Sequence, residues 1–130
     1  MIFRLLSLLL FLGSTLNAGI CDLVVFSYDR PMQLYSFLES TETYVTGLND
    51  IHVIFRCSTK DFKYAYKKVK KRFPNVQFHM QSKETPHADF KPLVLETALN
   101  PSSKASFLLF SVDDIIVTDF VNLEECQSLL

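Results

Sequence analysis

Glycine is scarce in this sequence, and Gly13, Gly19 and Gly47 are its only three glycines among 130 residues. A P-loop or a Rossmann dinucleotide fingerprint needs several glycines close together, so that the backbone can approach phosphate groups. No such cluster is present, and the Gly-x-Ser-x-Gly motif of serine hydrolases is also missing. These absences argue against P-loop and Rossmann chemistry and leave a hydrolase triad without support.

The sequence has no tryptophan and only three cysteines, Cys21, Cys57 and Cys126. Three cysteines cannot all pair with one another, and their spacing matches no zinc or redox motif, so a disulfide framework is not expected. We expect Cys57 and Cys126 to be small residues that are buried or half-buried. The formal net charge of -1 gives no electrostatic reason to expect a nucleic-acid partner.

Residues 1–18 have the character of a targeting segment. Arg4 precedes an apolar run over residues 5–12, and small and polar residues then lead to Ala18. This order predicts a signal peptide cleaved after Ala18, which directs the protein to the secretory pathway or out of the cell. The alternative is a signal anchor that associates residues 1–18 with a membrane, although a span normally needs about 20 apolar residues.

Residues 19–130 alternate between patterns typical of strands and of helices, and their length allows one domain at most. Short apolar or alternating runs predict strands over residues 22–27, 51–55 and 76–80, and a fourth within 106–120. Apolar residues at helical spacing predict helices from Pro31 to Gly47 and over residues 61–73 and 93–99, with a polar loop over 81–89. The alternation predicts the α/β class, with a doubly wound, mostly parallel sheet and flanking helices.

The stretch that organises the chain is SFLLFSVDDIIVTDF, residues 106–120. Its continuous apolar run predicts a central strand buried on both faces. Asp113 and Asp114 then lie at the carboxyl end of this strand, the edge of an open α/β sheet where ligands bind. Adjacent carboxylates suit a hard divalent cation, Mn²⁺ or Mg²⁺. The alternative is a solvated pair that caps the strand end, but two neighbouring carboxylates repel each other and gain little there.

Two further loops, residues 27–31 and 56–59, are expected at the same edge. Their side-chain and backbone groups are candidates to hold the base and ribose of a nucleotide, while the acid pair holds a divalent cation against the diphosphate and stabilises its departure. The candidate nucleotide-sugar-binding residues are Ser27, Tyr28, Asp29, Arg30, Arg56, Ser58 and Lys91. The alternatives are a turn acid and a surface arginine for Asp29 and Arg30, and a solvated lysine at a helix start for Lys91.

The basic residues over 61–73 and the histidines His52 and His79 are each explained without a binding role. The lysine-rich side of the helix over residues 61–73 indicates either an anionic partner surface or a solvated face whose cations favour the helix C-terminus. The second is favoured, because no aromatic residues interleave with the basic ones. His52 and His79 are expected on the polar faces of their strands, and a ligand role is the alternative, since neither has a Cys or His partner at metal spacing.

Three segments together resemble a known family. VVFSYDRPMQLYSFLES, residues 24–40, is similar to the opening strand, Asn/Asp-Arg-Pro turn and leucine-rich helix of GT-A-fold glycosyltransferases of the family 2 type. DFKPLVLETAL, residues 89–99, resembles the helix that precedes the metal-binding strand of that family. FLLFSVDDIIVTDF, residues 107–120, resembles that strand with its DxD-like acids. The resemblance covers residues 21–130.

The resemblance implies a nucleotide-diphosphate-sugar donor, a divalent Mn²⁺ or Mg²⁺ ion, and transfer of the sugar to an unknown acceptor. It places Tyr28, Asp29 and Arg30 near the nucleotide, and Asp113 with Asp114 at the metal and the diphosphate.

Two departures from the family pattern shape the expectation. The acid motif reads Ser-Val-Asp-Asp, without acids at both ends of an Asp-x-Asp, and the sequence stops at Leu130, where the family continues into an acceptor-binding half. We therefore expect residues 19–130 to form an incomplete glycosyltransferase-like domain, the donor half of a transferase. The alternative is a truncated, non-catalytic, exported α/β binding or interaction module.

Overall fold

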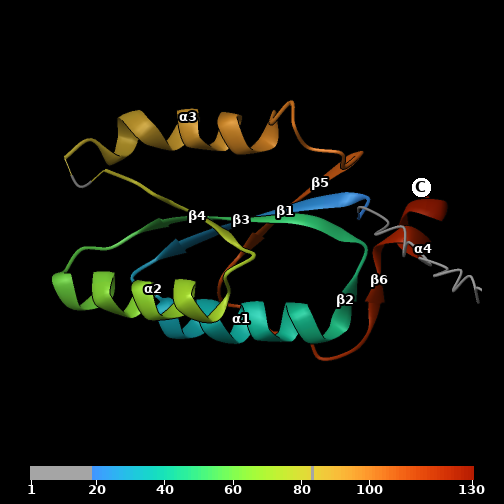
Figure 1. Ribbon diagram of the computed structural model, residues 1–130, viewed down its shortest axis with the longest axis horizontal. Coiled ribbons are helices and arrows are strands. Elements are labelled where there is room, and N and C mark those ends of the chain that lie inside the picture. Colours follow the sequence, from blue (N-terminus) through green and yellow to red (C-terminus); the bar gives the residue numbers. More distant parts are fainter. Residues whose placement is uncertain (1–18, 83) are drawn as a thin grey trace, which may run out of the picture.

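The computed structural model describes residues 19–82 and 84–130. The signal peptide or anchor predicted for residues 1–18 lies outside these residues. The described chain forms one central sheet, with helices α1 and α2 on one face and helix α3 on the other (Figure 1). Within the described ranges, none of the helices has both the length and the apolar character needed to cross a bilayer.

The central sheet has the order β4-β3-β1-β5, and every neighbouring pair of strands is parallel. Its strands are β1 (Cys21–Tyr28), β3 (Leu48–Arg56), β4 (Gln77–Met80) and β5 (Phe107–Val112). The helices are α1 (Pro31–Tyr44), α2 (Lys60–Arg72), α3 (Pro86–Ala98) and α4 (Leu123–Ser128). A second, two-stranded parallel sheet joins β2 (Val45–Thr46) to β6 (Val121–Asn122). The predicted α/β class, with a mostly parallel sheet between flanking helices, is confirmed.

The hydrophobic core lies between the central strands and helices α1 and α2. Alternate residues of β1 and β3, such as Val25 and Val53, point to this face, where Leu34 and Leu38 of α1 meet them. This follows from the period of two in a strand, which places every second side chain on the same face. Helix α1 begins at Pro31, as predicted, because proline at the first helical position loses no hydrogen bond.

Helix α2 begins after Thr59, whose side-chain oxygen accepts a 3.2 Å hydrogen bond from the backbone N–H of Phe62. This is the N-cap geometry for which threonine is one of the preferred residues. The lysines of α2 are exposed, and Lys70, Lys71 and Arg72 lie in its last turn. The arrangement matches the solvated-face interpretation of the basic residues.

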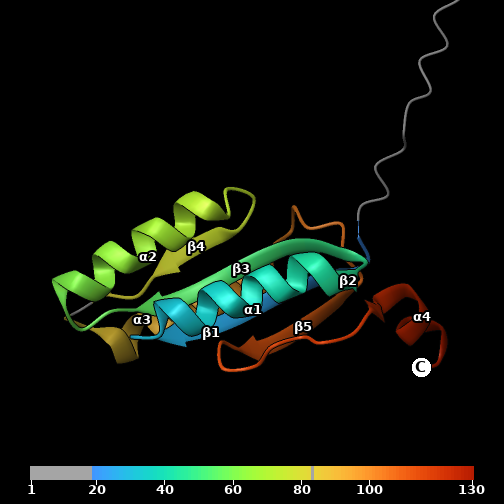
Figure 2. The same ribbon diagram turned by 90° about the horizontal axis from the view of Figure 1, so that it is seen from below.

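The prediction that the fourth strand is central and buried on both faces is wrong. Within the described sheet β5 is an edge strand that pairs with β1 alone. Phe107, Leu109, Phe110 and Val112 are exposed on it. Figure 2 shows the reason, since α1 runs over β1 and β3 while β5 lies to one side. A continuous apolar run does not distinguish a central strand from an edge strand that no helix covers.

Three smaller predictions also fail. Helix α3 begins at Pro86 within the predicted polar loop and continues through Pro92, whereas the sequence pattern predicted a helix only over residues 93–99. Cys126 is exposed rather than buried or half-buried. His52 is buried, with 2% of its surface exposed, because α3 covers the strand face that it occupies.

Candidate functional site

The polar loops that follow β1, β3 and β5 lie at one edge of the sheet. The register pairs Tyr28 with Arg56 and Phe26 with Val112, so the three strands end almost level. Since all three strands are parallel, their carboxyl ends share this edge. The loops that were predicted to converge are therefore neighbours in space.

A cleft of about 320 Å³ opens at this edge. Five of the candidate site residues line it, namely Ser27, Tyr28, Arg30, Asp113 and Asp114. The rest of the lining is mainly apolar and consists of Phe26, Ile54, Gln81, Phe90 and Val112. The cleft thus combines a charged wall with an aromatic and aliphatic one, a combination typical of small-molecule sites.

Asp113 is held in place by a chain of hydrogen bonds. Ser27 Oγ donates to Asp113 Oδ2 over 2.5 Å, and Tyr66 Oη lies 2.6 Å from Ser27 Oγ. The backbone N–H of Arg30 donates to Tyr66 Oη over 3.1 Å, so the tyrosine hydroxyl has its own hydrogen to donate to Ser27. Asp113 is only 3% exposed, and the interpretation of the acids as a solvated pair therefore does not hold for it.

Tyr66 is a site residue that the sequence did not reveal, because the helical pattern assigned it to the apolar face of α2. Burial raises the pKa of its hydroxyl, and the hydrogen bonds with Ser27 and the Arg30 backbone oppose that rise only in part. A buried tyrosine hydroxyl normally finds a polar partner. The sequence signal for this role was that a tyrosine, with its hydroxyl group, stands at a core-facing position of the helix where phenylalanine would suffice for packing.

Arg30 lies beside both carboxylates. Its Nη1 atom is 3.7 Å from Asp113 Oδ1 and 3.3 Å from Asp114 Oδ2. Asp114 and Arg30 each have about half of their side-chain surface exposed, at 54% and 50%. The cleft therefore presents one buried carboxylate, one exposed carboxylate and one cation that partly neutralises them.

Asp29 connects the loop over residues 27–31 to the loop over residues 56–59. Its carboxylate accepts hydrogen bonds from the backbone N–H of Ser58 over 2.7 Å and from Ser58 Oγ over 2.5 Å. Asp29 also has φ of 54°, in the left-handed region that aspartate tolerates better than most residues. The guanidinium carbon of Arg56 lies 5.1 Å from the centre of the Tyr28 ring, in a cation–π arrangement. Tyr28 lines the cleft, and Asp29, Arg56 and Ser58 lie outside its lining.

Lys91, like Asp29, Arg56 and Ser58, is a candidate that does not line the cleft. It is exposed on α3, next to Phe90, which does line the cleft. The ring centre of Phe90 lies 5.5 Å from that of Phe26. Gln81 lines the cleft as well and donates a 3.0 Å hydrogen bond to the carbonyl of Pro86. The polar loop predicted over residues 81–89 begins at Gln81, but no sequence pattern identified Gln81 or Phe90 as a site residue.

The cleft offers oxygen ligands of the kind that Mg²⁺ and Mn²⁺ bind. Among the described residues, no third Asp, Glu, His or Cys ligand lies close enough to Asp113 and Asp114 to complete a three-residue metal group. Mg²⁺ commonly takes one or two carboxylates and completes its shell with substrate phosphates and waters. Asp113 and Asp114 fit an ion of this type that arrives together with a phosphate ligand.

Comparison with known proteins gives one informative relationship. The chain is 29% identical over 116 residues to the bifunctional glycosyltransferase pgtA of Dictyostelium discoideum, a similarity that covers 82% of the chain. The chain spans only 14% of the length of that relative. No protein-family model matches the chain, and no solved structure matches it significantly. The similarity supports a distant glycosyltransferase relationship.

Proposed function

We propose that the cleft binds a nucleotide-diphosphate sugar, and that the chain is the donor-binding part of a glycosyltransferase of the GT-A, family 2 type. One observation carries this proposal: the buried Asp113 and the exposed Asp114 stand together at the carboxyl edge of a parallel sheet, beside Arg30. The similarity to a glycosyltransferase supports it independently.

The charged wall suits the diphosphate of such a donor. Asp113 and Asp114 would hold Mn²⁺ or Mg²⁺, an ion that neutralises charge on the departing nucleoside diphosphate when it is bound. Arg30 is half exposed and presents a guanidinium group at the same point. Guanidinium groups bind phosphate oxygens through charge-assisted hydrogen bonds. Ser27 and Tyr66 act indirectly, since they hold the Asp113 carboxylate in one orientation.

The remaining lining suits the nucleoside. Tyr28 is exposed by 51% at the mouth of the cleft, with the Arg56 guanidinium over its ring. Phe26 and Phe90 provide apolar lining surface for a flat base or a sugar ring. The volume of the cleft is at the lower end of the range of ligand pockets, about 300–1,000 Å³. It is large enough for part of a nucleotide-diphosphate sugar.

Lys91 and residues 1–18, which do not line the cleft, also have proposed roles. Lys91, exposed one position after Phe90, is proposed to reach a phosphate of the bound donor. Residues 1–18 are proposed to direct the chain to the secretory pathway, with membrane association as the alternative.

A second candidate function is a binding module without turnover. The position of Arg30 favours it, because a cation already lies within 4 Å of both carboxylates, at 3.7 Å and 3.3 Å. A module of this kind would bind the donor without a divalent metal. Dependence of binding on Mn²⁺ separates the two candidates.

Equilibrium dialysis of the full chain against radiolabelled UDP- and GDP-sugars, with manganese chloride present, tests donor binding. We expect Arg30→Gln to weaken binding about tenfold or more, since hydrogen bonds to charged groups contribute about 1.5–3 kcal/mol. Arg72→Gln is the matched control, because Arg72 is exposed on α2 and lies 3.7 Å from Glu42, outside the cleft lining. Equal binding by both variants would show that Arg30 does not contact the donor.

A further inference from the structure

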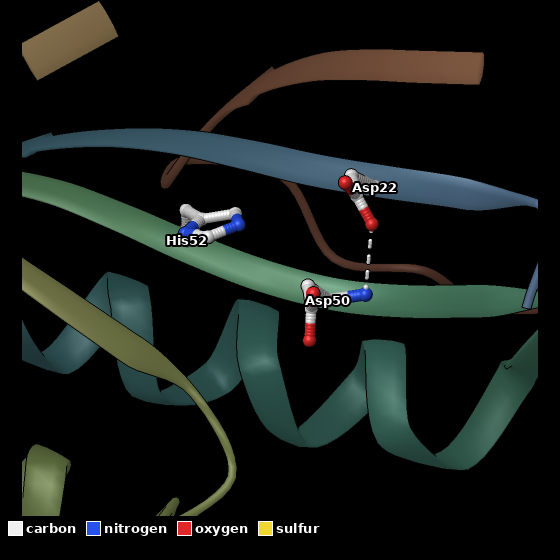
Figure 3. A group of neighbouring side chains, drawn as sticks. All are labelled: Asp22, Asp50 and His52. Carbon is white, nitrogen blue, oxygen red and sulfur yellow. Dashed lines mark hydrogen bonds between the residues drawn. The ribbon is translucent and has the colours of Figure 1, made fainter. Parts of the chain in front are cut away.

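A second group of metal-ligand side chains lies toward the amino ends of the strands, away from the cleft. Asp22 is near the start of β1, and Asp50 and His52 are in the first half of β3. One ligand atom from each residue lies within 4.8 Å of the other two (Figure 3). All three residues lie on the sheet face covered by α3, opposite the face that packs on α1 and α2.

His52 is buried with one ring nitrogen unused. Its Nδ1 atom lies 3.2 Å from Nε2 of His79 on β4, whereas its own Nε2 has no hydrogen-bond partner. Strand β3 separates β4 from β1, so the free nitrogen is the one that faces the carboxylates. Figure 3 shows one ring nitrogen of His52 on the side that faces Asp22 and Asp50. Buried polar nitrogens normally have a partner, and a lone pair in this position is suited to a metal ion.

Asp22 is a carboxylate with a fixed orientation. Its Oδ1 accepts hydrogen bonds from the side-chain amide of Asn49 over 2.8 Å and from the backbone N–H of Asp50 over 3.0 Å. Its Oδ2 accepts one from Ser103, in the loop between α3 and β5. Each carboxylate oxygen has two acceptor positions, so Oδ2 keeps a free one. Hydrogen bonds of this type hold the ligands of metal sites in place.

We propose that Asp22, Asp50 and His52 bind a divalent transition-metal ion of the zinc class. His52 Nε2 is the nitrogen ligand, and His79 accepts the Nδ1–H hydrogen bond that fixes this tautomer, as the outer partner of a metal-bound histidine commonly does. An imidazole with two carboxylates suits zinc better than magnesium. Three protein ligands leave the fourth tetrahedral position to water. The ion would join β1 to β3 and, through Ser103, to the loop after α3.

This site is separate from the nucleotide-sugar cleft, which has oxygen ligands alone. The two proposals therefore fail independently. Zinc binding here depends on His52 and not on Asp114, whereas manganese-dependent nucleotide binding depends on Asp114 and not on His52.

The test is calorimetric titration of the metal-stripped full chain with zinc chloride alone, in a Cys126→Ser background that removes an exposed thiol. We expect one equivalent of zinc to bind. Replacement of an outer partner of a metal site typically costs about 10–100-fold in affinity, so His52→Gln, which removes the ligand itself, should cost at least about tenfold. His87→Gln, at an exposed histidine of α3, should leave the affinity unchanged.

A second measurement covers the case in which His52→Gln does not fold. In the otherwise unaltered Cys126→Ser chain, nitrogen-15 NMR of the imidazoles should show that zinc shifts the His52 Nε2 resonance. The proposal is overturned if the chain binds no zinc, if His52→Gln binds it as tightly as its parent, or if zinc shifts only the resonances of other histidines.

Discussion

Ser27, at the end of β1, donates a 2.5 Å hydrogen bond to Asp113, the first residue after β5. The two residues are 86 positions apart in the sequence, and the pairing of β1 with β5 brings them together. The bond fixes a buried carboxylate at the edge of the cleft before any ligand binds. Functional groups held in this way need no rearrangement when the ligand arrives.

Removing the Ser27 hydroxyl should destabilise the protein. Ser27→Ala leaves one oxygen of Asp113 and the hydroxyl of Tyr66 without their shared partner in a buried region. We expect the free energy of unfolding, measured by urea denaturation, to fall by about 1–3 kcal/mol. Ser128→Ala is the control, because Ser128 is exposed and bonds only to a carbonyl of its own helix. An equal effect from the two substitutions would show that the Ser27 bond contributes nothing to stability.

Tyr66 should ionise later than exposed tyrosines. Burial raises its pKa above the ordinary value of 10.0. On alkaline titration followed by ultraviolet absorbance, Tyr66→Phe should remove the last transition, and Tyr64→Phe, at an exposed position, an earlier one.

The same shift predicts how stability depends on alkaline pH. The unfolded state loses the Tyr66 proton first, so this contribution to stability is complete below the ordinary pKa of 10.0 and is lost as the pH rises through the folded pKa. The free energy of unfolding of the unmodified chain should therefore fall more steeply above about pH 10 than that of Tyr66→Phe. Parallel curves would contradict the assignment.

His79 should make the protein sensitive to mild acid. Its pKa is below the ordinary value of 6.5, first because of burial, and then because of His52 on β3 and Lys70 on α2, while Glu96 on α3 opposes them. The contribution to stability is present above 6.5 and is lost as the pH falls through the folded pKa, because the unfolded state then binds the proton more readily. Urea denaturation between about pH 7.5 and pH 5 should show a smaller loss for His79→Gln than for His87→Gln. The opposite order would contradict this account.

Gly47 should resist substitution. Its φ of 89° lies in the left-handed region, and a β-carbon there would lie 3.2 Å from Cβ of Leu123. We expect Gly47→Ala to lower the free energy of unfolding by at least about 1–2 kcal/mol. Thr46→Ala, at the neighbouring exposed position, is the comparison. A Gly47→Ala protein as stable as its Thr46→Ala counterpart would show that the turn relaxes without cost.

Local signals in the sequence were sufficient for much of the fold. Pro31 and Thr59 mark helix starts by their own chemistry, and the apolar runs of β1 and β3 predicted strands that are buried in the structure. The convergence of the loops followed from the parallel topology, because parallel strands end at a common edge. The acid pair was therefore placed at the correct edge of the sheet.

The predictions that were wrong or missing concern features that depend on residues far away in the sequence. The exposure of β5 depends on which helices cover it, and the burial of His52 depends on α3, and neither is encoded in the local pattern. Tyr66 has the periodicity of a core residue, and its hydroxyl gains a role only because Ser27 and Arg30 happen to face it. Asp22 and His52 are 30 residues apart and on different strands, so no spacing motif connects them.

The central claim is that the acid pair makes a metal-dependent nucleotide-diphosphate site. The most direct measurement is calorimetric titration of the chain with UDP and GDP, with and without Mn²⁺, for the unmodified protein, Asp114→Asn and Asp119→Asn. Asp114 is exposed at the cleft, and Asp119 is an exposed carboxylate outside the cleft lining. We predict that one nucleotide binds only with Mn²⁺, and that Asp114→Asn alone abolishes or strongly weakens this binding. Absence of binding by folded protein, or binding that neither Mn²⁺ nor Asp114→Asn changes, would contradict the claim.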